Sequence, residues 1–361
     1  MNAVRAFFPA LLLLSVSAAW AAEPAPIEGD YVVPEFHFDS GESMRNLRLH
    51  YTTYGRPRRD AQGHVTNAVL ILHGTGGSGA NFTTPQFAGV LFGPGQLLDA
   101  SRYYIILPDG IGHGKSSRPS DGMHMRFPHY DYRDMVAAQH LLLTDGLKVD
   151  HLRLVMGTSM GCMQSFVWAE TWPDFADAAM PLACLTVEIA GRNRIWRKMA
   201  TEAITSDPAW DNGEYKSEPR GLVTAMYFLF LAVSSPLELQ TDYPTRAQAD
   251  ADLQAWIAQR LPKYDANDLL YQLDASRDYN PSAKLGDIRA PVLWINSADD
   301  MVNPPELGIA QREVKKIPHG RFVLLPISPE TRGHSTHSLP AVWKADLAQL
   351  LAEGGGHEAT P

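Results

Sequence analysis

The sequence predicts a protein of the α/β class, in which a doubly wound, mostly parallel β-sheet carries a separate helical insertion. Two short runs, at 68–72 and 103–107, are apolar throughout and lead into glycine-rich loops, as is typical of strands buried on both faces of a parallel sheet. Residues 132–143 have helical apolar spacing and precede a further strand, so strands and helices alternate along the chain. From 187 to 281 the pattern changes to helix-like segments separated by turn signals, which predicts the insertion.

The other elements can be assigned in chain order. Strand-like stretches at 31–33 and 47–51, separated by turn residues, predict an antiparallel hairpin before the parallel strands. Further strands are expected at 151–155, 178–185, 291–295 and 321–325, an amphipathic helix at 339–351, and a disordered tail at 354–361. We therefore divide the mature chain into a first core part at 22–186, the helical insertion at 187–281 and a second core part at 282–361.

Length and charge limit the class of partner. The chain has 361 residues, of which 45% are hydrophobic, and this is enough for one large α/β domain or a core domain with an insertion. A formal net charge of −9, with no run that mixes Lys or Arg with aromatic residues, excludes a nucleic acid or an anionic membrane as the main partner. A small molecule is the expected partner, and a homodimer is left open.

The N-terminal segment 1–21 has the parts of a secretory signal peptide. Arg5 precedes an apolar stretch at 6–20, and Ala19-Trp20-Ala21 forms an A-x-A type cleavage site. A stretch of about fifteen apolar residues is shorter than the roughly twenty that span a bilayer, and the apolar stretch at 226–233 is shorter still. We therefore expect cleavage and export to the periplasm or beyond, with no stable membrane anchor.

Cys162 and Cys184 are the only cysteines, so the sequence lacks a disulfide framework, although an exported protein could still join the two. Cys162 falls within an apolar helix that is expected to face the core, where cysteine usually behaves as a small hydrophobic residue. We therefore expect two buried free thiols.

The pattern Gly157-x-Ser159-x-Gly161 stands between the strand at 151–155 and an apolar helix that ends at Pro173. A strand that turns sharply into a helix can hold one residue at its tip in a strained conformation, with its side chain clear of the sheet, and only glycine fits beside such a turn. The pattern fixes only three positions and also arises by chance, but its place between strand and helix favours Ser159 as a nucleophile.

A serine nucleophile needs a histidine base and a carboxylate that orients the histidine, and in folds of this type the acid and then the histidine follow the serine. The loop after the strand at 291–295 offers Asp299 and Asp300. The loop before the last helix offers His334, directly after a glycine, with His337 as its rival. Their positions after strands favour catalysis over the alternative of solvated surface residues.

The oxyanion that forms during acyl transfer needs two backbone N–H donors, each worth about 3 kcal/mol of transition-state stabilisation. The amide of Met160, directly after the serine, is one candidate. The amide of Thr75, in the loop HGTGGSG, is the other, although a plain glycine-rich turn would have the same sequence.

Arg194 and Arg197 belong to a basic run that opens the insertion. Arginine suits bidentate contacts with a carboxylate, so the two are candidates for substrate binding. The alternative, which is more common for such runs, is a solvated helix face.

No cofactor and no metal are expected. The pattern Gly74-x-Gly76-x-x-Gly79 fits a dinucleotide fingerprint, but Asp99, at the spacing of its acidic partner, precedes a strand instead of ending one. His334 and His337 alone make a poor metal site, and the sequence has no H-E-x-x-H or C-x-x-C motif.

Several stretches together resemble the homoserine O-acetyltransferase family of α/β-hydrolases. They are LRLHYTTYG at 47–55, FPHYDYRDMVAAQHLLL at 127–143, GTSMGCMQSFVWAETWPD at 157–174, DPAWDNGEY at 207–215 and DDMVNPP at 299–305. The resemblance implies an α/β-hydrolase fold, an acyl-serine intermediate and a helical lid over a deep active-site tunnel. It also identifies the triad as Ser159, Asp300 and His334, since Asp300 has the family's four-residue spacing to a proline.

The chain departs from the family pattern near the serine. Thr158 and Cys162 stand where the family tends to have glycine, and HGTGG at 73–77 is closer to ordinary hydrolases. Because acetyl-CoA is not expected outside the cytoplasm, export leaves water as the acyl acceptor. We therefore predict an exported serine hydrolase that cleaves a small ester or, with less preference, an amide or thioester. The alternative is an acyltransferase that uses acetyl-CoA.

Overall fold

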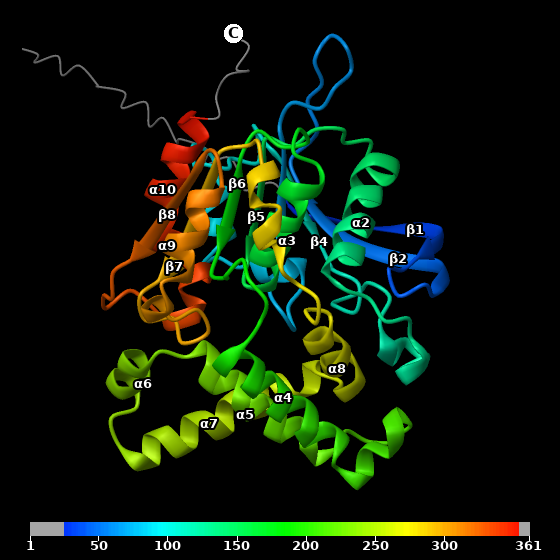
Figure 1. Cartoon of the computed structure of the whole chain (residues 1–361), viewed down its shortest axis with the longest axis vertical. Helices are drawn as coiled ribbons and strands as arrows, with labels where there is room; N and C mark the ends of the chain where they lie inside the picture. The colour runs from blue at the N-terminus through cyan, green and yellow to red at the C-terminus, as the bar shows by residue number, and fades with distance from the viewer. Residues whose placement is uncertain (1–24, 354–361) are drawn as a thin grey trace, which may run out of the picture.

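The computed structural model describes residues 25–353, so the expected signal peptide at 1–21 and the tail at 354–361 lie outside the described residues. Within the described part, eight strands form one sheet in the order β1-β2-β4-β3-β5-β6-β7-β8 (Figure 1). β1 and β2 form an antiparallel hairpin, β2 also pairs antiparallel with β4, and the other neighbours are parallel. The predicted hairpin and mostly parallel sheet are therefore confirmed.

The strands of the parallel part are short and deeply buried. Every residue of β3, β4 and β5 is buried, which is why these segments are apolar throughout. The strands are β1 (Ile27–His37), β2 (Ser43–Tyr54), β3 (Ala68–Leu72), β4 (Tyr104–Pro108), β5 (Leu154–Thr158), β6 (Ala179–Leu182), β7 (Val292–Ser297) and β8 (Gly320–Leu325). The helices of the core are α1 (Ala88–Leu91), α2 (Tyr132–Leu141), α3 (Met160–Thr171), α9 (Ile309–Glu313) and α10 (Pro340–Glu353).

Helices cover both faces of the sheet. On one face, α2 and α3 pack through a buried cluster that includes Met135, Phe166 and Trp168. On the other face, α1 and α10 pack through a cluster that includes Leu91 and Trp343. The sheet is therefore doubly wound, and its strand ends are the place where a site can form.

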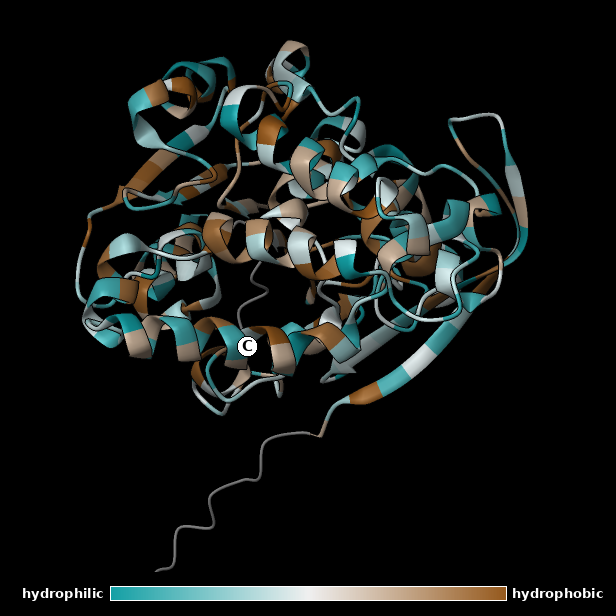
Figure 2. Ribbon diagram, turned by 90° about the horizontal axis from the view of Figure 1, so that it is seen from below, coloured by the Kyte–Doolittle hydropathy of each residue, from teal (hydrophilic) through white to brown (hydrophobic). Residues whose placement is uncertain are grey.

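Between β6 and β7 the chain forms the helical insertion, with α4 (Gly191–Thr205), α5 (Arg220–Val233), α6 (Pro236–Asp242), α7 (Arg246–Arg260) and α8 (Ala266–Asp274). These helices have a core of their own, in which Ala200, Leu222, Met226 and Ile257 are buried. The insertion lies below the core in Figure 1, beyond the carboxyl ends of the parallel strands, and in the view from that side its helices cross the core with polar and apolar residues interspersed (Figure 2). It therefore covers the strand ends.

Within residues 25–353, no single helix is both long and apolar enough to cross a membrane. The pair α5 and α6 meets the criteria only when counted together, and it is bent by 101° at its break.

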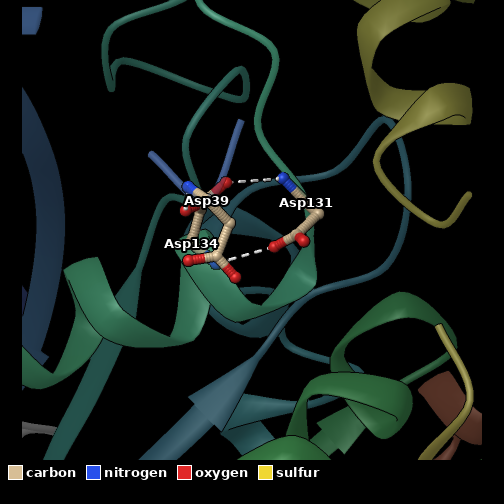
Figure 3. A group of neighbouring side chains, drawn as sticks. All are labelled: Asp39, Asp131 and Asp134. Atoms are coloured by element: carbon tan, nitrogen blue, oxygen red, sulfur yellow. Dashed lines mark hydrogen bonds between the residues drawn. The ribbon is translucent and has the colours of Figure 1, made fainter. Parts of the chain in front are cut away.

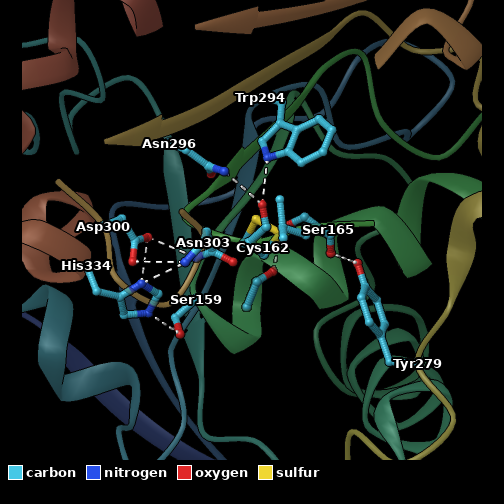
Figure 4. The surroundings of a disulfide bond; sticks show 12 residues. Ser159, Cys162, Ser165, Tyr279, Trp294, Asn296, Asp300, Asn303 and His334 are labelled. Carbon is cyan, nitrogen blue, oxygen red and sulfur yellow. Dashed lines mark hydrogen bonds and ion pairs between the residues drawn. A yellow bond between two sulfur atoms is a disulfide. The ribbon is translucent and has the colours of Figure 1, made fainter. Parts of the chain in front are cut away.

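The expectation of two free thiols is wrong, because Cys162 and Cys184 form a disulfide with their Cα atoms 5.8 Å apart (Figure 4). Cys162 lies in the first turn of α3, directly after β5, and Cys184 follows the end of β6. β5 and β6 are adjacent parallel strands, so the chain leaves the sheet at neighbouring points. Both cysteines are buried, as expected, and their bond ties α3 to the segment that enters the insertion.

Replacing both cysteines by alanine removes a cross-link between positions 22 residues apart. The loss of loop-closure entropy for that spacing amounts to about 3 kcal/mol, so Cys162→Ala/Cys184→Ala is expected to lower the free energy of unfolding by about this amount. Urea unfolding followed by tryptophan fluorescence measures the change. Dithiothreitol should bring the wild type to the stability of the double variant and leave the variant unaffected, and a wild type indifferent to the reductant would contradict the disulfide.

Candidate active site

Ser159 lies at the turn between β5 and α3 with φ 55° and ψ −111°, a conformation that is rare for any residue except glycine. The flanking glycines are required by close contacts. A Cβ at Gly161 would lie 2.0 Å from the carbonyl oxygen of Leu72 in β3, and a Cβ at Gly157 would lie 2.1 Å from the carbonyl oxygen of Gly161. The Ser159 amide donates to the Leu182 oxygen of β6 at 2.9 Å, which fixes the turn to the sheet. The serine side chain thus has a defined place beyond the strand ends.

The structure brings three of the predicted residues together from distant parts of the chain (Figure 4). His334 Nε2 lies 2.8 Å from Ser159 Oγ, and His334 Nδ1 lies 2.9 Å from Asp300 Oδ2. An ionised carboxylate only accepts hydrogen bonds, so Nδ1 carries a proton and Nε2 accepts from the serine hydroxyl. In this arrangement a histidine can remove the proton of an attacking serine.

Asp300 is buried and is held by donors from its own loop. Its Oδ1 accepts from the amides of Val302 at 2.8 Å and Asn303 at 3.2 Å, and its Oδ2 accepts from the Asn303 side chain at 2.9 Å. Burial alone would raise the pKa of the Asp300 carboxyl, but the neighbouring His334 and these donors together lower it. Asp300 therefore stays ionised beside the histidine and can stabilise an imidazolium ion. The role of Asn303 has no signal in the sequence.

The two rival residues have other contacts. The Asp299 carboxylate accepts from the Gly333 amide and the Thr331 hydroxyl, both at 2.9 Å, so it anchors the loop that carries His334. The ring of His337 stands edge-on to that of His334, with the ring centroids 5.2 Å apart. Burial, assisted by the nearby His334, lowers the pKa of His337 to about 3, so this ring is neutral at ordinary pH. Of each pair, the structure thus places His334 next to the serine and Asp300 next to His334.

The loop after β3 lies against the serine. A Cβ at Gly74 would lie 3.2 Å from the Cβ of Ser159, so the loop that continues into Thr75 flanks the nucleophile. Among the hydrogen bonds that residues 25–353 make with one another, neither the Thr75 amide nor the Met160 amide is a donor. Both predicted N–H groups are therefore available to an oxyanion.

His73 is a second residue with a role in the site that was not predicted from the sequence. It lies between the end of β3 and the glycine-rich loop. Its Nε2 accepts from the Gly110 amide at 3.0 Å. Its Nδ1 therefore carries the proton and donates to the Gly74 oxygen at 2.8 Å. Burial lowers the pKa of His73, which keeps the ring neutral in this role. His73 thus connects the loop beside the serine to the segment after β4, and its position directly after a buried strand was the available signal.

Arg194 and Arg197, which were expected to bind a substrate carboxylate, both lie on α4 but in different surroundings. Arg194 is exposed. Arg197 is buried, with its Nε donating to Asn193 at 2.9 Å and its Nη1 donating to Ser276 at 3.2 Å, so it joins α4 to the segment after α8. Within the described chain neither arginine bonds to the serine, the histidine or Asp300, and their substrate role stays a prediction.

The stretch DPAWDNGEY packs against the start of α8. Trp210 Nε1 donates to Asn267 Oδ1 at 2.9 Å, and the Tyr215 hydroxyl donates to the Asp265 carboxylate at 2.7 Å. The Gly213 oxygen accepts from Asn267 Nδ2 at 2.9 Å, so the buried Asn267 side chain is bonded on both sides. This stretch of the family resemblance therefore fixes the middle of the insertion to α8, the helix after which the chain returns to the core.

Oxygen atoms of Asp39, Asp131 and Asp134 lie within 4.8 Å of one another, a spacing that a metal ion could use (Figure 3). Protein donors already account for the cluster. Asp134 and Asp131 each accept from the other's amide, at 3.0 and 2.9 Å, which caps α2, and Asp134 also accepts from the Asp39 amide at 2.8 Å. Arg133 forms ion pairs with Asp39 and Asp131. The cluster is thus a helix cap with its own counter-ion.

Comparisons with known proteins show similarity in sequence and in fold. Residues 67–328 fit the family model described as the alpha/beta hydrolase fold. The chain is 30% identical over 307 residues to the homoserine O-acetyltransferase of Geotalea uraniireducens (strain Rf4), covering 75% of this chain and 81% of that protein. Two solved structures, both below 25% identity, share the fold. Homoserine O-acetyltransferase from Bacillus anthracis has a TM-score of 0.78 at 20% identity, and the acetyl esterase MekB has a TM-score of 0.77 at 24% identity, each covering 90% of this chain and 97% of that one.

Asn303 offers a test of the site geometry. Asn303→Ala is expected to slow the reaction of Ser159 with a fluorophosphonate probe about tenfold, because Asp300 loses a donor that sets the direction of its Oδ2 toward His334. Asn303→Asp keeps the shape but places an acceptor beside the carboxylate, so it should react more slowly still. Labelling rates are read by mass spectrometry, with thermal unfolding as the folding control. Unchanged labelling in both folded variants would show that Asn303 does not position Asp300.

Proposed function

The chain belongs to the homoserine O-acetyltransferase-like family of α/β-hydrolases, and from this membership we propose that it is a serine esterase that cleaves a small ester through an acyl-serine intermediate. The observation that carries the proposal is the hydrogen-bonded series from Ser159 through His334 to Asp300, at 2.8 and 2.9 Å. Thr75 and Met160 supply the amides for the oxyanion. Amides and thioesters are less favoured substrates.

In the first half of the reaction, Ser159 Oγ attacks the carbonyl carbon of the ester while its proton passes to His334 Nε2. The amides of Thr75 and Met160 stabilise the negative charge on the carbonyl oxygen, and Asp300 stabilises the imidazolium. The bond between the carbonyl carbon and the alcohol oxygen then breaks. His334 gives its proton to that oxygen, the alcohol leaves, and the acyl group stays on the serine.

In the second half, a water molecule takes the place of the alcohol. His334 Nε2 accepts one proton of the water as its oxygen attacks the acyl carbon, and the same two amides receive the oxyanion. The bond to Ser159 Oγ breaks, and His334 returns the proton to the serine. The carboxylic acid leaves, and the enzyme is regenerated with all atoms accounted for.

Transfer of the acyl group to another alcohol is the second candidate, and the 30% identity to a homoserine O-acetyltransferase favours it. The contacts of Arg197 support hydrolysis instead. This buried cation, one of the two arginines expected to bind a substrate carboxylate, is already engaged by Asn193 and Ser276. Hydrolysis needs no such acceptor site, because water is present in any accessible pocket.

Parallel assays on the purified protein separate the two candidates. The wild type is expected to hydrolyse p-nitrophenyl acetate, and Ser159→Ala is expected to lose at least about a thousandfold in kcat because the nucleophile is gone. Circular dichroism of the variant controls for folding. The matched assay supplies acetyl-CoA with and without homoserine. Release of CoA that requires homoserine, together with no ester hydrolysis, would replace the esterase with the transferase.

We also propose that the protein is exported after removal of residues 1–21. The disulfide between Cys162 and Cys184 supports this, since such bonds persist in oxidising compartments and are rare in the cytosol. Cells that express the full chain can be fractionated and the N-terminal peptide sequenced by mass spectrometry. A chain beginning at Ala22 outside the cytoplasm is the expected result, and an intact N-terminus in the cytoplasmic fraction would contradict export.

A further inference from the structure

A polar pocket lies beside the loop that carries Thr75, at the seam between the core and the insertion. Its volume of about 340 Å³ is near the lower end of the range for small-molecule sites. The glycine loop and Asn81 form one wall, and Arg118, from the segment after β4, forms another. The third wall belongs to the insertion and consists of Lys263, Tyr264 and side chains of α8. None of these side chains has a part in the acyl-transfer steps described above.

The pocket begins one residue away from a proposed oxyanion amide. Gly76, which follows Thr75, lines the pocket, and a Cβ at Gly76 would lie 2.7 Å from the Tyr264 hydroxyl oxygen. Gly74, on the other side of Thr75, abuts Ser159. Because successive Cα atoms are about 3.8 Å apart, Gly76 lies within about 8 Å of Gly74. This separation is within the length of a small ester.

The charges around the pocket balance. Arg118 and Lys263 are positive, and Asp265 and Asp268 are negative. Protein donors already occupy the carboxylates: Asp268 accepts from the amide and hydroxyl of Ser120 at 2.9 and 2.7 Å, and Asp265 accepts from the Asp268 amide at 3.0 Å. An anionic ligand would face two carboxylates and a cationic ligand two cations, so the lining disfavours both. A neutral ligand fits this set of charges.

The same pocket also has neutral hydrogen-bonding groups that other described residues do not engage. Among the described residues, the Tyr264 hydroxyl and the Asn81 side-chain nitrogen have no hydrogen-bond partner, while Asn81 Oδ1 accepts from the Ser78 amide at 2.9 Å. The Gln272 side chain at the pocket wall donates to the Gly112 oxygen, and its own oxygen is unpaired. A hydroxyl group both donates and accepts, so a ligand with several hydroxyls matches such a mixed set. An alkyl group would leave the exposed polar groups of the pocket without a partner.

We propose that this pocket binds the alcohol half of the ester and that this half is a neutral polyhydroxylated group, such as one sugar ring. The inference rests on the proposed esterase function. In the acylation step the bond between the acyl carbon and the sugar oxygen breaks, and the free sugar takes its proton from His334. Asn81 and Lys263 are exposed at the pocket, so the released sugar leaves directly into solvent.

Two acetate esters, one of a polar sugar ring and one of an apolar carbon ring, test the proposal. In 6-O-acetylglucose and cyclohexylmethyl acetate, acetate is attached to the CH₂ group of a six-membered ring, but only the first ring carries hydroxyls. The wild type is expected to favour the sugar ester at least tenfold in kcat/KM. Tyr264→Phe, which removes one hydroxyl and keeps the ring, should cut kcat/KM for the sugar ester about fivefold, mainly through KM, as expected for one neutral hydrogen bond. The same variant should change cyclohexylmethyl acetate less than twofold.

Tyr243→Phe, in the link between α6 and α7, is the matched control and should change neither ester. Equal kcat/KM for the two esters, or an equal effect of Tyr264→Phe on both, overturns the sugar subsite and leaves the esterase standing. If the protein hydrolyses neither of these esters and also fails to hydrolyse p-nitrophenyl acetate, the esterase proposal is overturned, and the subsite proposal with it. Thermal unfolding confirms that both variants are folded, and competitive inhibition by methyl glucoside, weakened in Tyr264→Phe alone, is the independent supporting result.

Discussion

The close approach of α3 to β3 at Gly161 is the constraint on which the rest of the site depends. With 2.0 Å between a hypothetical Cβ and the Leu72 oxygen, only glycine lets the helix begin this near to the sheet. The chain must therefore turn within one residue, and Ser159 takes a conformation that costs about 1–3 kcal/mol. Burial of almost the whole of α3, including Phe166 and Trp168, compensates for this cost. The strained conformation of Ser159 is thus retained because the packing of α3 against the sheet does not permit a relaxed turn.

The histidine has to meet this fixed serine from another part of the chain, and two neighbouring aspartates divide that task. Asp300 bonds to the ring of His334, whereas Asp299 bonds to the backbone of the loop that carries the ring. Both lie in the loop after β7. The Cys184 oxygen accepts from the side chains of Trp294 and Asn296 in β7, each at 3.1 Å, and Cys184 is joined to α3 by the disulfide (Figure 4). Ser159, Asp300 and His334 are therefore held by one continuous set of contacts across the sheet.

The sequence alone predicts the features that depend on neighbouring residues. Fully buried parallel strands require unbroken apolar runs, and the turn at Ser159 requires glycines at fixed positions, so both are visible in a short stretch. The choice between Asp299 and Asp300 is not visible in this way, because the two are adjacent in one loop and differ only in the direction in which their side chains point. The family resemblance was needed to choose between them. The disulfide was missed because it depends on β6 lying next to β5, and strand order has no local signal. Asn303 and His73 were missed for a similar reason, since each acts through a bond to another segment.

The insertion is attached to the core more firmly on one side than on the other. This difference determines which part of the insertion is rigid enough to recognise a substrate. On the side of α8, all residues but the last are buried, and the helix bonds to three points of the segment between β4 and α2 through Asp268, Tyr271 and Gln272. On the side of α5 and α6, the histidine loop is held by a hydrogen bond from the Ser335 hydroxyl to the Val233 oxygen at 3.1 Å and by the partly exposed ion pair between Arg332 and Glu238, a type of contact worth at most about 1 kcal/mol. Groups fixed by α8 are therefore already in place before a ligand arrives, so binding against them costs little ordering of the protein. The wall of the proposed subsite, which is formed by α8 and the residues just before it, is thus the pre-ordered part of the insertion.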